Sequence, residues 1–200
     1  VFGAPGEGSC LDIMDAARSA KIDFVATDTS GAAAIMAATD GDLCGRPGVC
    51  VTALGSSAAR AVSGIAEALA DRMPLVVLAG SPARRHRRNF IGGRLDQNRL
   101  FDGITKDQAT ITPARASRLI AWALEECMTP PAGPVYLELP ADTASATARD
   151  RLLTPGTRRR PTPSPSAVRR TGMLLTRAGR AVVVAGNETT RHAISGGLVA

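Results

Sequence analysis

The sequence contains few of the side chains that usually bind metals or stack on ligands. Aromatic residues make up 3% of the 200 residues, and the chain has two histidines and four cysteines. The cysteines stand far apart without a CxxC motif, so neither a zinc site nor a disulfide framework is indicated; they are Cys10, Cys44, Cys50 and Cys127. We therefore expect no metal ligands here, buried reduced thiols and a reducing, cytoplasmic compartment.

Long hydrophobic runs are also missing. No apolar stretch reaches the roughly 18 residues that a membrane span needs, and no charged segment followed by an apolar one indicates a leader. We therefore expect no membrane partner. The chain begins at Val1 rather than at Met, which leaves open a segment upstream of it.

Positive charge is present but concentrated. The net charge is +6, and two clusters hold much of it: Arg84, Arg85, Arg87 and Arg88, and then Arg158 to Arg160 with Arg169 and Arg170. No aromatic side chains that could stack on bases are interleaved with these arginines. The clusters are predicted to be solvated loop charge, with binding of some other anion left open, and no nucleic-acid partner is expected.

Small apolar residues and glycine are abundant, and one segment shows how they are used. Hydrophobic residues make up 44% of the chain, which has 20 glycines, a composition typical of closely packed α/β proteins. In the segment 45–80, Val49 to Leu54 predicts a buried strand, and apolar residues at helical spacing from Ala58 to Leu69 predict a helix. Pro74 ends that helix before a second strand, Leu75 to Ala79. Two parallel strands joined by one helix follow from this order.

The remaining elements extend the same pattern. We predict the end of a strand at Val1-Phe2, a helix with Ser9 as its N-cap, a strand over Ile22–Ala26, a helix over Gly31–Ala38, a long polar loop over Ser81–Phe101, a helix over Ala116–Cys127 and a strand over Val135–Leu139. Residues 1–150 are therefore predicted to form a doubly wound, mainly parallel sheet flanked by helices. An extended Pro/Arg-rich linker is expected over 151–170, followed over 171–200 by the truncated start of a second α/β domain with a strand at Ala181–Ala185.

Ligands of such sheets bind where the strands end. We expect a crevice there, lined by Gly3 to Gly6, Thr27 to Ser30 and Gly55 to Arg60. A dinucleotide-binding domain is one alternative, because a glycine-rich turn precedes the first helix. The turn GAPGEGS lacks the GxGxxG order, however, and Pro5 removes one amide donor.

The ordered motifs resemble a known family. VFGAPG, GAAAIMA, GRPGVC, LGSSAAR, GIAEALADRMPLVVLAG, ITK at Ile104 to Lys106 and PAGPVYLELPAD cover nearly all of residues 1–142. Together they resemble the N-terminal pyrimidine-binding domain of thiamine-diphosphate-dependent enzymes, with acetolactate synthase and its relatives most similar. The segment from Arg169 would correspond to the start of that family's central domain.

This resemblance implies an activity and its cofactors. It implies decarboxylation of a 2-keto acid and transfer of the resulting carbanion equivalent to an acceptor carbonyl, with thiamine diphosphate carrying the chemistry. Carried over to this sequence, the cofactor-binding positions are Gly3, Pro5, Gly6, Thr52, Gly55, Ser56 and Arg60. The resemblance further implies a homodimer or homotetramer, a Mg²⁺ site outside this chain, and FAD in the central domain of some members.

The sequence departs from the family where the pyrimidine ring is handled. Thr29 occupies the place of a glutamate that holds a proton for the ring, and Asp28 beside it is the candidate substitute. Gly55 to Arg60 stands where GPGAxN is usual, and Gly92-Gly93-Arg94 where Phe-Gln-Glu is usual. These departures keep a second hypothesis open, namely a non-catalytic structural or regulatory descendant of the same fold.

Overall fold

A computed structural model describes residues 1–6, 8–86, 95–153, 162–184, 186 and 189 of the chain. Its contacts divide the chain into two units, Val1–Thr157 and Arg158–Ala200. The first unit contains the strands β1 (Phe2–Gly3), β2 (Val25–Ala26), β3 (Gly48–Thr52), β4 (Leu75–Ser81), β5 (Asp107–Thr110) and β6 (Pro134–Pro140). Its helices are α1 (Ser9–Ser19), α2 (Ser30–Cys44), α3 (Ser56–Arg60), α4 (Val62–Ala70), the 3₁₀ turn η1 (Arg84–His86), α5 (Gln97–Asp102), α6 (Ala116–Met128) and α7 (Ala141–Ala144).

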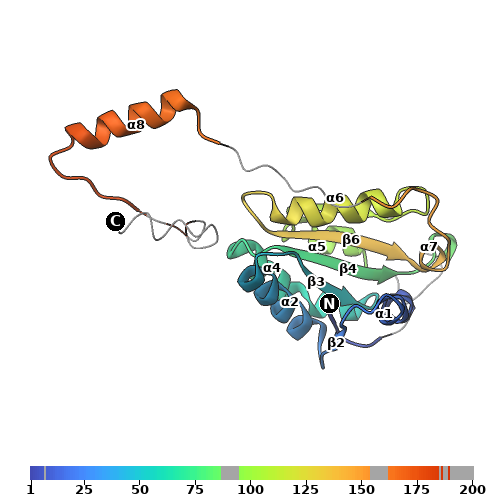
Figure 1. Cartoon of the computed structure of the whole chain (residues 1–200). Helices are drawn as coiled ribbons and strands as arrows, with labels where there is room; N and C mark the ends of the chain where they lie inside the picture. The colour runs from blue at the N-terminus through green and yellow to red at the C-terminus, as the bar shows by residue number, and fades with distance from the viewer. Residues whose placement is uncertain (7, 87–94, 154–161, 185, 187–188, 190–200) are drawn as a thin grey trace. The chain divides into compact units, whose positions relative to one another are not determined.

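The first unit is built on one parallel sheet (Figure 1). Its six strands lie in the order β2-β1-β3-β4-β6-β5, and every neighbouring pair is parallel. The predicted α/β class with a mainly parallel sheet is confirmed. The two parallel strands predicted over 45–80 are also present, because β3 pairs with β4 from Gly48↔Leu75 to Thr52↔Ala79. The one helix predicted between them is divided into α3 and α4 at Ala61.

Helices cover both faces of this sheet. On one face, α2, α4 and Phe101 of α5 pack on Cys50, Val77 and Tyr136. On the other face, α1 and α6 pack on the alternate strand residues, such as Val51 and Val135. Successive residues of a strand point to opposite faces of the sheet. Because both faces are covered by helices, the central strands are apolar at nearly every position.

Helix α2 lies unusually close to β3 because small residues line their contact. A Cβ at Gly48 would overlap the carbonyl oxygen of Ala37, and one at Gly41 would lie 2.6 Å from the backbone nitrogen of Gly48. Helix α2 runs to Cys44, past its predicted end at Ala38. The predicted end was too early. Glycine is unfavourable inside a helix, but α2 continues through Gly41, where the helix comes closest to β3.

Three local predictions are corrected. Gly8, not Ser9, is the N-cap of α1, and Ser9 lies inside the helix, where its hydroxyl donates to the carbonyl of Leu139 at 3.1 Å. The strand predicted over Ile22–Ala26 shortens to β2 at the sheet edge. The predicted loop Ser81–Phe101 contains η1 and the start of α5, and its residues 87–94 lie outside the described residues.

Strand β5 was not predicted, and the ITK motif explains how it is held. Lys106 precedes it and donates from Nζ to the carbonyls of Glu126 and Thr129, at 2.7 and 2.8 Å. The same ammonium lies 3.1 Å from Oε1 of Glu126. Because the last carbonyls of a helix have no partner within the helix, Lys106 fastens the carboxyl end of α6 to the sheet edge.

The second unit contains helix α8 (Pro165–Arg177), which begins inside the segment predicted to be an extended linker. Its start follows ordinary capping rules, since the Ser164 hydroxyl accepts from the Ala167 amide and Pro165 occupies the first turn. Residues 181–184 form no strand in the structure, and residue 185 of that predicted strand lies outside the described residues. A strand needs a pairing partner, and none is present among the described residues of this unit. The domain limits at 150 and 170 stay predictions.

Two composition-based expectations can be checked. None of the helices in the described part of the chain is both long and apolar enough to cross a bilayer. All four cysteines are free thiols. Cys10, Cys50 and Cys127 are buried as predicted, whereas Cys44 at the end of α2 is exposed.

The close contact of α2 and β3 predicts the effect of a single methyl group. Gly48→Ala should lower the free energy of unfolding by about 3 kcal/mol, because backbone atoms rather than a flexible side chain would have to move. The matched control is Gly103→Ala, where nothing lies within 4 Å of the new methyl and φ is −85°. That control should be neutral or stabilise by about 0.5 kcal/mol. Urea titration of both variants tests the difference, and equal midpoints would contradict it.

Candidate functional site

A cavity of about 430 Å³ lies at the carboxyl ends of the strands. Its lining comes from the residues that follow β1, β2 and β3, together with the start of α3: Ala4, Pro5, Gly6, Asp28, Thr29, Ser30, Ala53, Leu54, Gly55, Ser56, Ser57 and Arg60. The chain leaves β1 for β2 on one side and later returns to place β3 on the other side. The cavity therefore sits at the switch point of the strand order, where open α/β sheets bind ligands.

The structure gathers most of the predicted site residues at this cavity, but not all of them. Gly3 is buried one residue before the lining, where a Cβ would lie 2.6 Å from the Phe24 ring. Thr52 is fully buried and also lies outside the lining, and its hydroxyl has no hydrogen-bond partner among the described residues. Gly3 is the last residue of β1 and Thr52 is the last residue of β3. Both therefore position the lining residues that follow them without being part of the lining.

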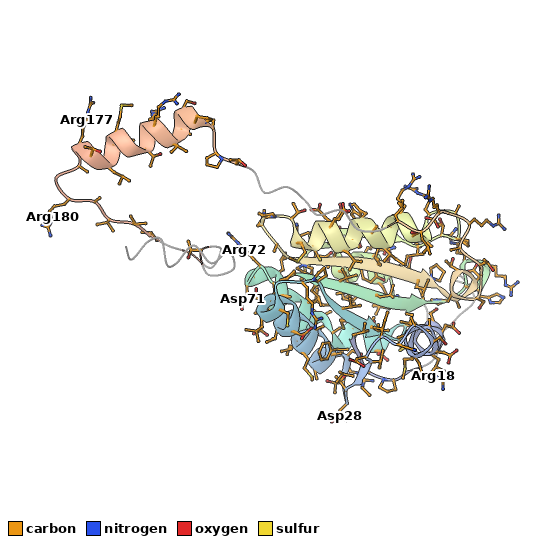
Figure 2. The ribbon with its side chains drawn as sticks, viewed as in Figure 1. Arg18, Asp28, Asp71, Arg72, Arg177 and Arg180 are labelled. Carbon is orange, nitrogen blue, oxygen red and sulfur yellow. The ribbon has the colours of Figure 1, made fainter. Side chains whose placement is uncertain are left out.

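Thr29 starts helix α2 at the cavity. Its Oγ1 accepts a hydrogen bond from the Ala32 amide at 3.1 Å, which makes it the N-cap. Its carbonyl accepts from the Thr27 hydroxyl at 3.0 Å. The hydroxyl proton of Thr29 is not used in either bond, so this side chain can donate one hydrogen bond to a ligand. Asp28 precedes it and is exposed at the turn after β2 (Figure 2).

Two serines join the starts of α2 and α3. The hydroxyls of Ser30 and Ser57 are 2.8 Å apart and share a hydrogen bond. Ser30 is 2% exposed, so this bond fixes the spacing of the two helix starts around the cavity. Both serines lie in the ranges predicted to line the crevice, Thr27 to Ser30 and Gly55 to Arg60, but the bond between them was not predicted. The only sequence signal was the cap-forming composition of Thr29-Ser30, which says nothing of a partner 27 residues away.

Thiol or metal chemistry has little support at this edge of the sheet. Burial raises the pKa of Cys50 to about 12 and also raises that of Cys10, so these thiols stay protonated near neutral pH. Among the described residues, no group of three His, Cys, Asp or Glu side chains is placed to hold a metal ion.

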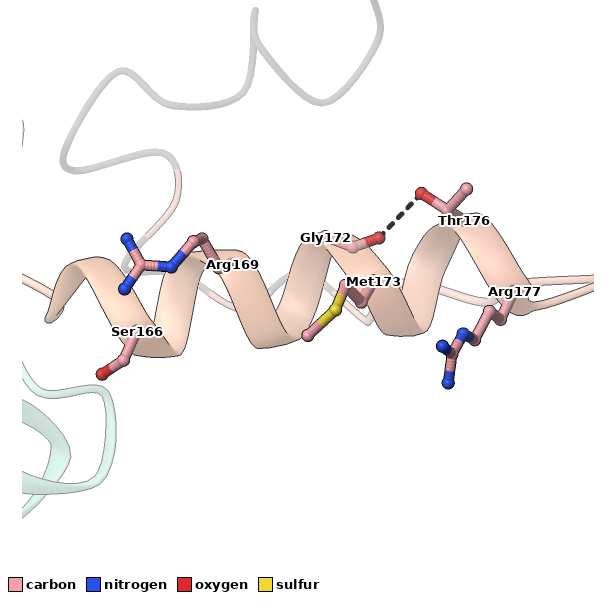
Figure 3. Close-up of a pocket in the computed structure, with 6 residues that line it drawn as sticks. All are labelled: Ser166, Arg169, Gly172, Met173, Thr176 and Arg177. Atoms are coloured by element: carbon pink, nitrogen blue, oxygen red, sulfur yellow. Dashed lines mark hydrogen bonds between the residues drawn. The ribbon is translucent and has the colours of Figure 1, made fainter.

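A second hollow, of about 550 Å³, lies along α8 (Figure 3). All the residues that line it belong to that one helix: Ser166, Arg169, Gly172, Met173, Thr176 and Arg177. Each of them is exposed. Because binding sites need side chains that converge from several elements, we take the cavity at the sheet edge as the candidate site.

An open parallel α/β domain with a cavity at its switch point defines a class of ligand-binding domain. Within that class, residues 1–102 match the family described as thiamine pyrophosphate enzyme, N-terminal TPP binding domain. The chain therefore belongs to the thiamine pyrophosphate enzyme family, whose cofactor is also called thiamine diphosphate. The resemblance inferred from the motifs is confirmed.

Curated relatives agree with this family. The probable acetolactate synthase large subunit of Methanocaldococcus jannaschii is 29% identical over 194 residues, 93% of this chain and 33% of that protein. The 2-hydroxyacyl-CoA lyase of Saccharomyces cerevisiae is 30% identical over 144 residues, 71% of this chain and 25% of that protein. The mitochondrial acetolactate synthase of Schizosaccharomyces pombe is 32% identical over 158 residues, 76% of this chain and 23% of that protein. The chain thus spans about a third or less of the length of these relatives.

The capping role of Thr29 predicts a stability effect that is independent of any ligand. Thr29→Val keeps the side-chain shape but removes the acceptor for the Ala32 amide, so the free energy of unfolding should fall by about 1 kcal/mol. Thr29→Ser keeps the acceptor and should stay within about 0.5 kcal/mol of the parent. Denaturant unfolding, with hydrogen exchange at the Ala32 amide, measures both. Equal stability of the two variants would show that the bond contributes nothing.

Proposed function

We propose that this chain contains the pyrimidine-binding domain of an acetolactate synthase-like enzyme that decarboxylates 2-keto acids and joins the product to an acceptor carbonyl. The observation that carries the proposal is the cavity at the switch point, which lies within the part of the chain that matches the family. Relatives named acetolactate synthase and 2-hydroxyacyl-CoA lyase support the transferase or lyase class.

The size and polarity of the cavity suit the pyrimidine ring of thiamine diphosphate. Its volume of about 430 Å³ lies within the range of small-molecule sites, and its lining offers hydroxyls and a glycine turn rather than a closed apolar wall. Pro5, Gly6, Gly55 and Ser56 would line the ring, and the Thr29 hydroxyl would donate to it. Thiamine diphosphate, when bound, supplies the carbanion chemistry that such a decarboxylation requires.

The residues of this chain would position the ring better than they would move its proton. A threonine hydroxyl donates a hydrogen bond but does not hold and release an acid proton near neutral pH, as a carboxylic acid can. Asp28 is the nearest acid in the lining, yet it is exposed and one residue away from the helix start. We therefore propose Thr29 as the residue that orients the ring and Asp28 as the candidate proton carrier.

Further parts of the proposal come from the family resemblance. We propose that Mg²⁺ and the diphosphate are held outside this chain, that FAD binds in the following domain, and that the protein is a cytoplasmic homodimer or homotetramer.

A non-catalytic descendant of the fold is the second candidate, favoured by the pocket composition. Thr29 and Arg60 replace a glutamate and an amide that the resemblance implies, while the small residues between α2 and β3 keep the fold. Binding separates the candidates: thiamine diphosphate affinity that depends on the pyrimidine ring supports the enzyme, and no affinity supports the descendant. Binding of NAD instead would support the dinucleotide-binding alternative.

The role of position 29 predicts a gain of activity. In the protein expressed with any residues that follow Ala200, Thr29→Glu should speed exchange of the C2 proton of bound thiamine diphosphate by about 10²-fold, because it adds a positioned acid.

Thr29→Gln is the matched control, since it has the same size and loses the same cap but carries no acid. It should leave the exchange rate at the parent value. Asp28→Asn should slow exchange in the parent if Asp28 is the proton carrier. Proton NMR of quenched samples measures all three rates, and equal rates for the Glu and Gln variants would place the proton-transfer position elsewhere.

A further inference from the structure

We propose that Gln97 is a positioning residue, which holds the Gly55 turn in the shape that the ligand cavity requires although Gln97 itself does not line the cavity. The proposal rests on the proposed function. Gln97 is the first residue of α5 and is 4% exposed. A buried amide is costly unless its polar atoms have partners, so its contacts are informative.

The Gln97 amide connects the turn after β3 to the end of β4. Its Oε1 accepts from the Gly55 backbone amide at 3.1 Å, and its Nε2 donates to the Gly80 carbonyl at 3.0 Å. Nε2 also lies 3.5 Å from the Tyr136 hydroxyl. A backbone amide only donates and a carbonyl only accepts, so these two partners fix which way the side-chain amide points. Neither a carboxylate nor an apolar side chain satisfies both.

The Gly55 turn needs such an anchor. Gly55 has φ of 65° and ψ of −119°, a conformation that favours glycine. Its carbonyl accepts from the Ala59 amide, at 3.0 Å, in the first turn of α3. No side chain in the described part of the chain caps α3, and the bond to Gln97 holds the other side of the turn. Ser56 and Ser57 follow immediately and line the cavity.

Gln97 is itself held from both ends of α5. The Asp96 carboxylate caps the helix by accepting from the Arg99 amide at 3.2 Å. At the other end, the Phe101 ring packs on Tyr136 with ring centroids 4.6 Å apart. Helix α5 is therefore held at both ends, and it connects the buried face of β6 to one wall of the cavity.

The test is a set of three variants, studied in the same protein as above. Gln97→Met removes both hydrogen bonds at similar size, and Gln97→Glu keeps the acceptor for Gly55 but loses the donor to Gly80. Ser117→Ala is the control, because it removes a buried hydroxyl that accepts from the Leu153 amide at 2.7 Å on α6, away from the cavity. Two readouts are measured: thiamine diphosphate affinity by calorimetry, and the ¹⁵N–¹H signals of Gly55, Ser56 and Ser57.

Gln97→Met should weaken affinity about tenfold and shift the Gly55 signal. Ser117→Ala should lower the melting temperature and leave affinity and the Gly55 signal unchanged. Gln97→Glu should bind weakly near neutral pH and regain affinity as the pH falls, because a protonated carboxyl can donate to Gly80 and still accept from Gly55.

Parent-like affinity and an unmoved Gly55 signal in Gln97→Met would overturn the positioning role, and so would an affinity of Gln97→Glu that does not rise as the pH falls. If Gln97→Met does not fold, the pH series of Gln97→Glu decides. If the parent protein binds no thiamine diphosphate, the proposed function fails, and the Gly55 signal alone then decides whether Gln97 shapes the turn.

Discussion

The close contact between α2 and β3 is the constraint on which the site depends. Gly41 and Gly48 bring the two backbones together, with the Ala37 backbone directly against Gly48, and the buried alanines of α2 add only methyl groups to the same core. A helix that is 15 residues long and fixed this closely has little freedom to tilt or slide. Its first residues are therefore held at the carboxyl edge of the sheet, where Thr29 and Ser30 meet the turn after β3.

The site divides its tasks between backbone and side chains. Glycine turns and serine hydroxyls give the cavity its shape, and the Ser30–Ser57 and Gln97–Gly55 hydrogen bonds hold them in place. The groups that would do chemistry stand at the rim, where Asp28 and Arg60 are exposed. Changes at the rim cost the fold little, since exposed side chains contribute little to stability. The same scaffold can thus carry different chemistry.

The fold was predictable wherever strands were apolar on both faces, as in the segment 45–80. Strand β5 was not predictable, because its residues are polar and it is a strand only through pairing with β6, next to the contact that Lys106 makes with α6. The crevice could be located because strand ends and glycine turns are local signals. The Ser30–Ser57 bond and the Gln97 bridge could not be, because both join segments that sequence periodicity does not relate.

The N-cap at Thr29 also has an evolutionary consequence. One side chain both closes the first turn of α2 and faces the cavity, so the position is under two selective demands that favour different residues. An acid long enough to reach a ligand is a poor cap, and its gain would leave the Ala32 amide without its partner. Changes at this position are therefore expected to be epistatic, with any exchange between a capping and an acidic residue tied to compensating substitutions in the first turn of the helix.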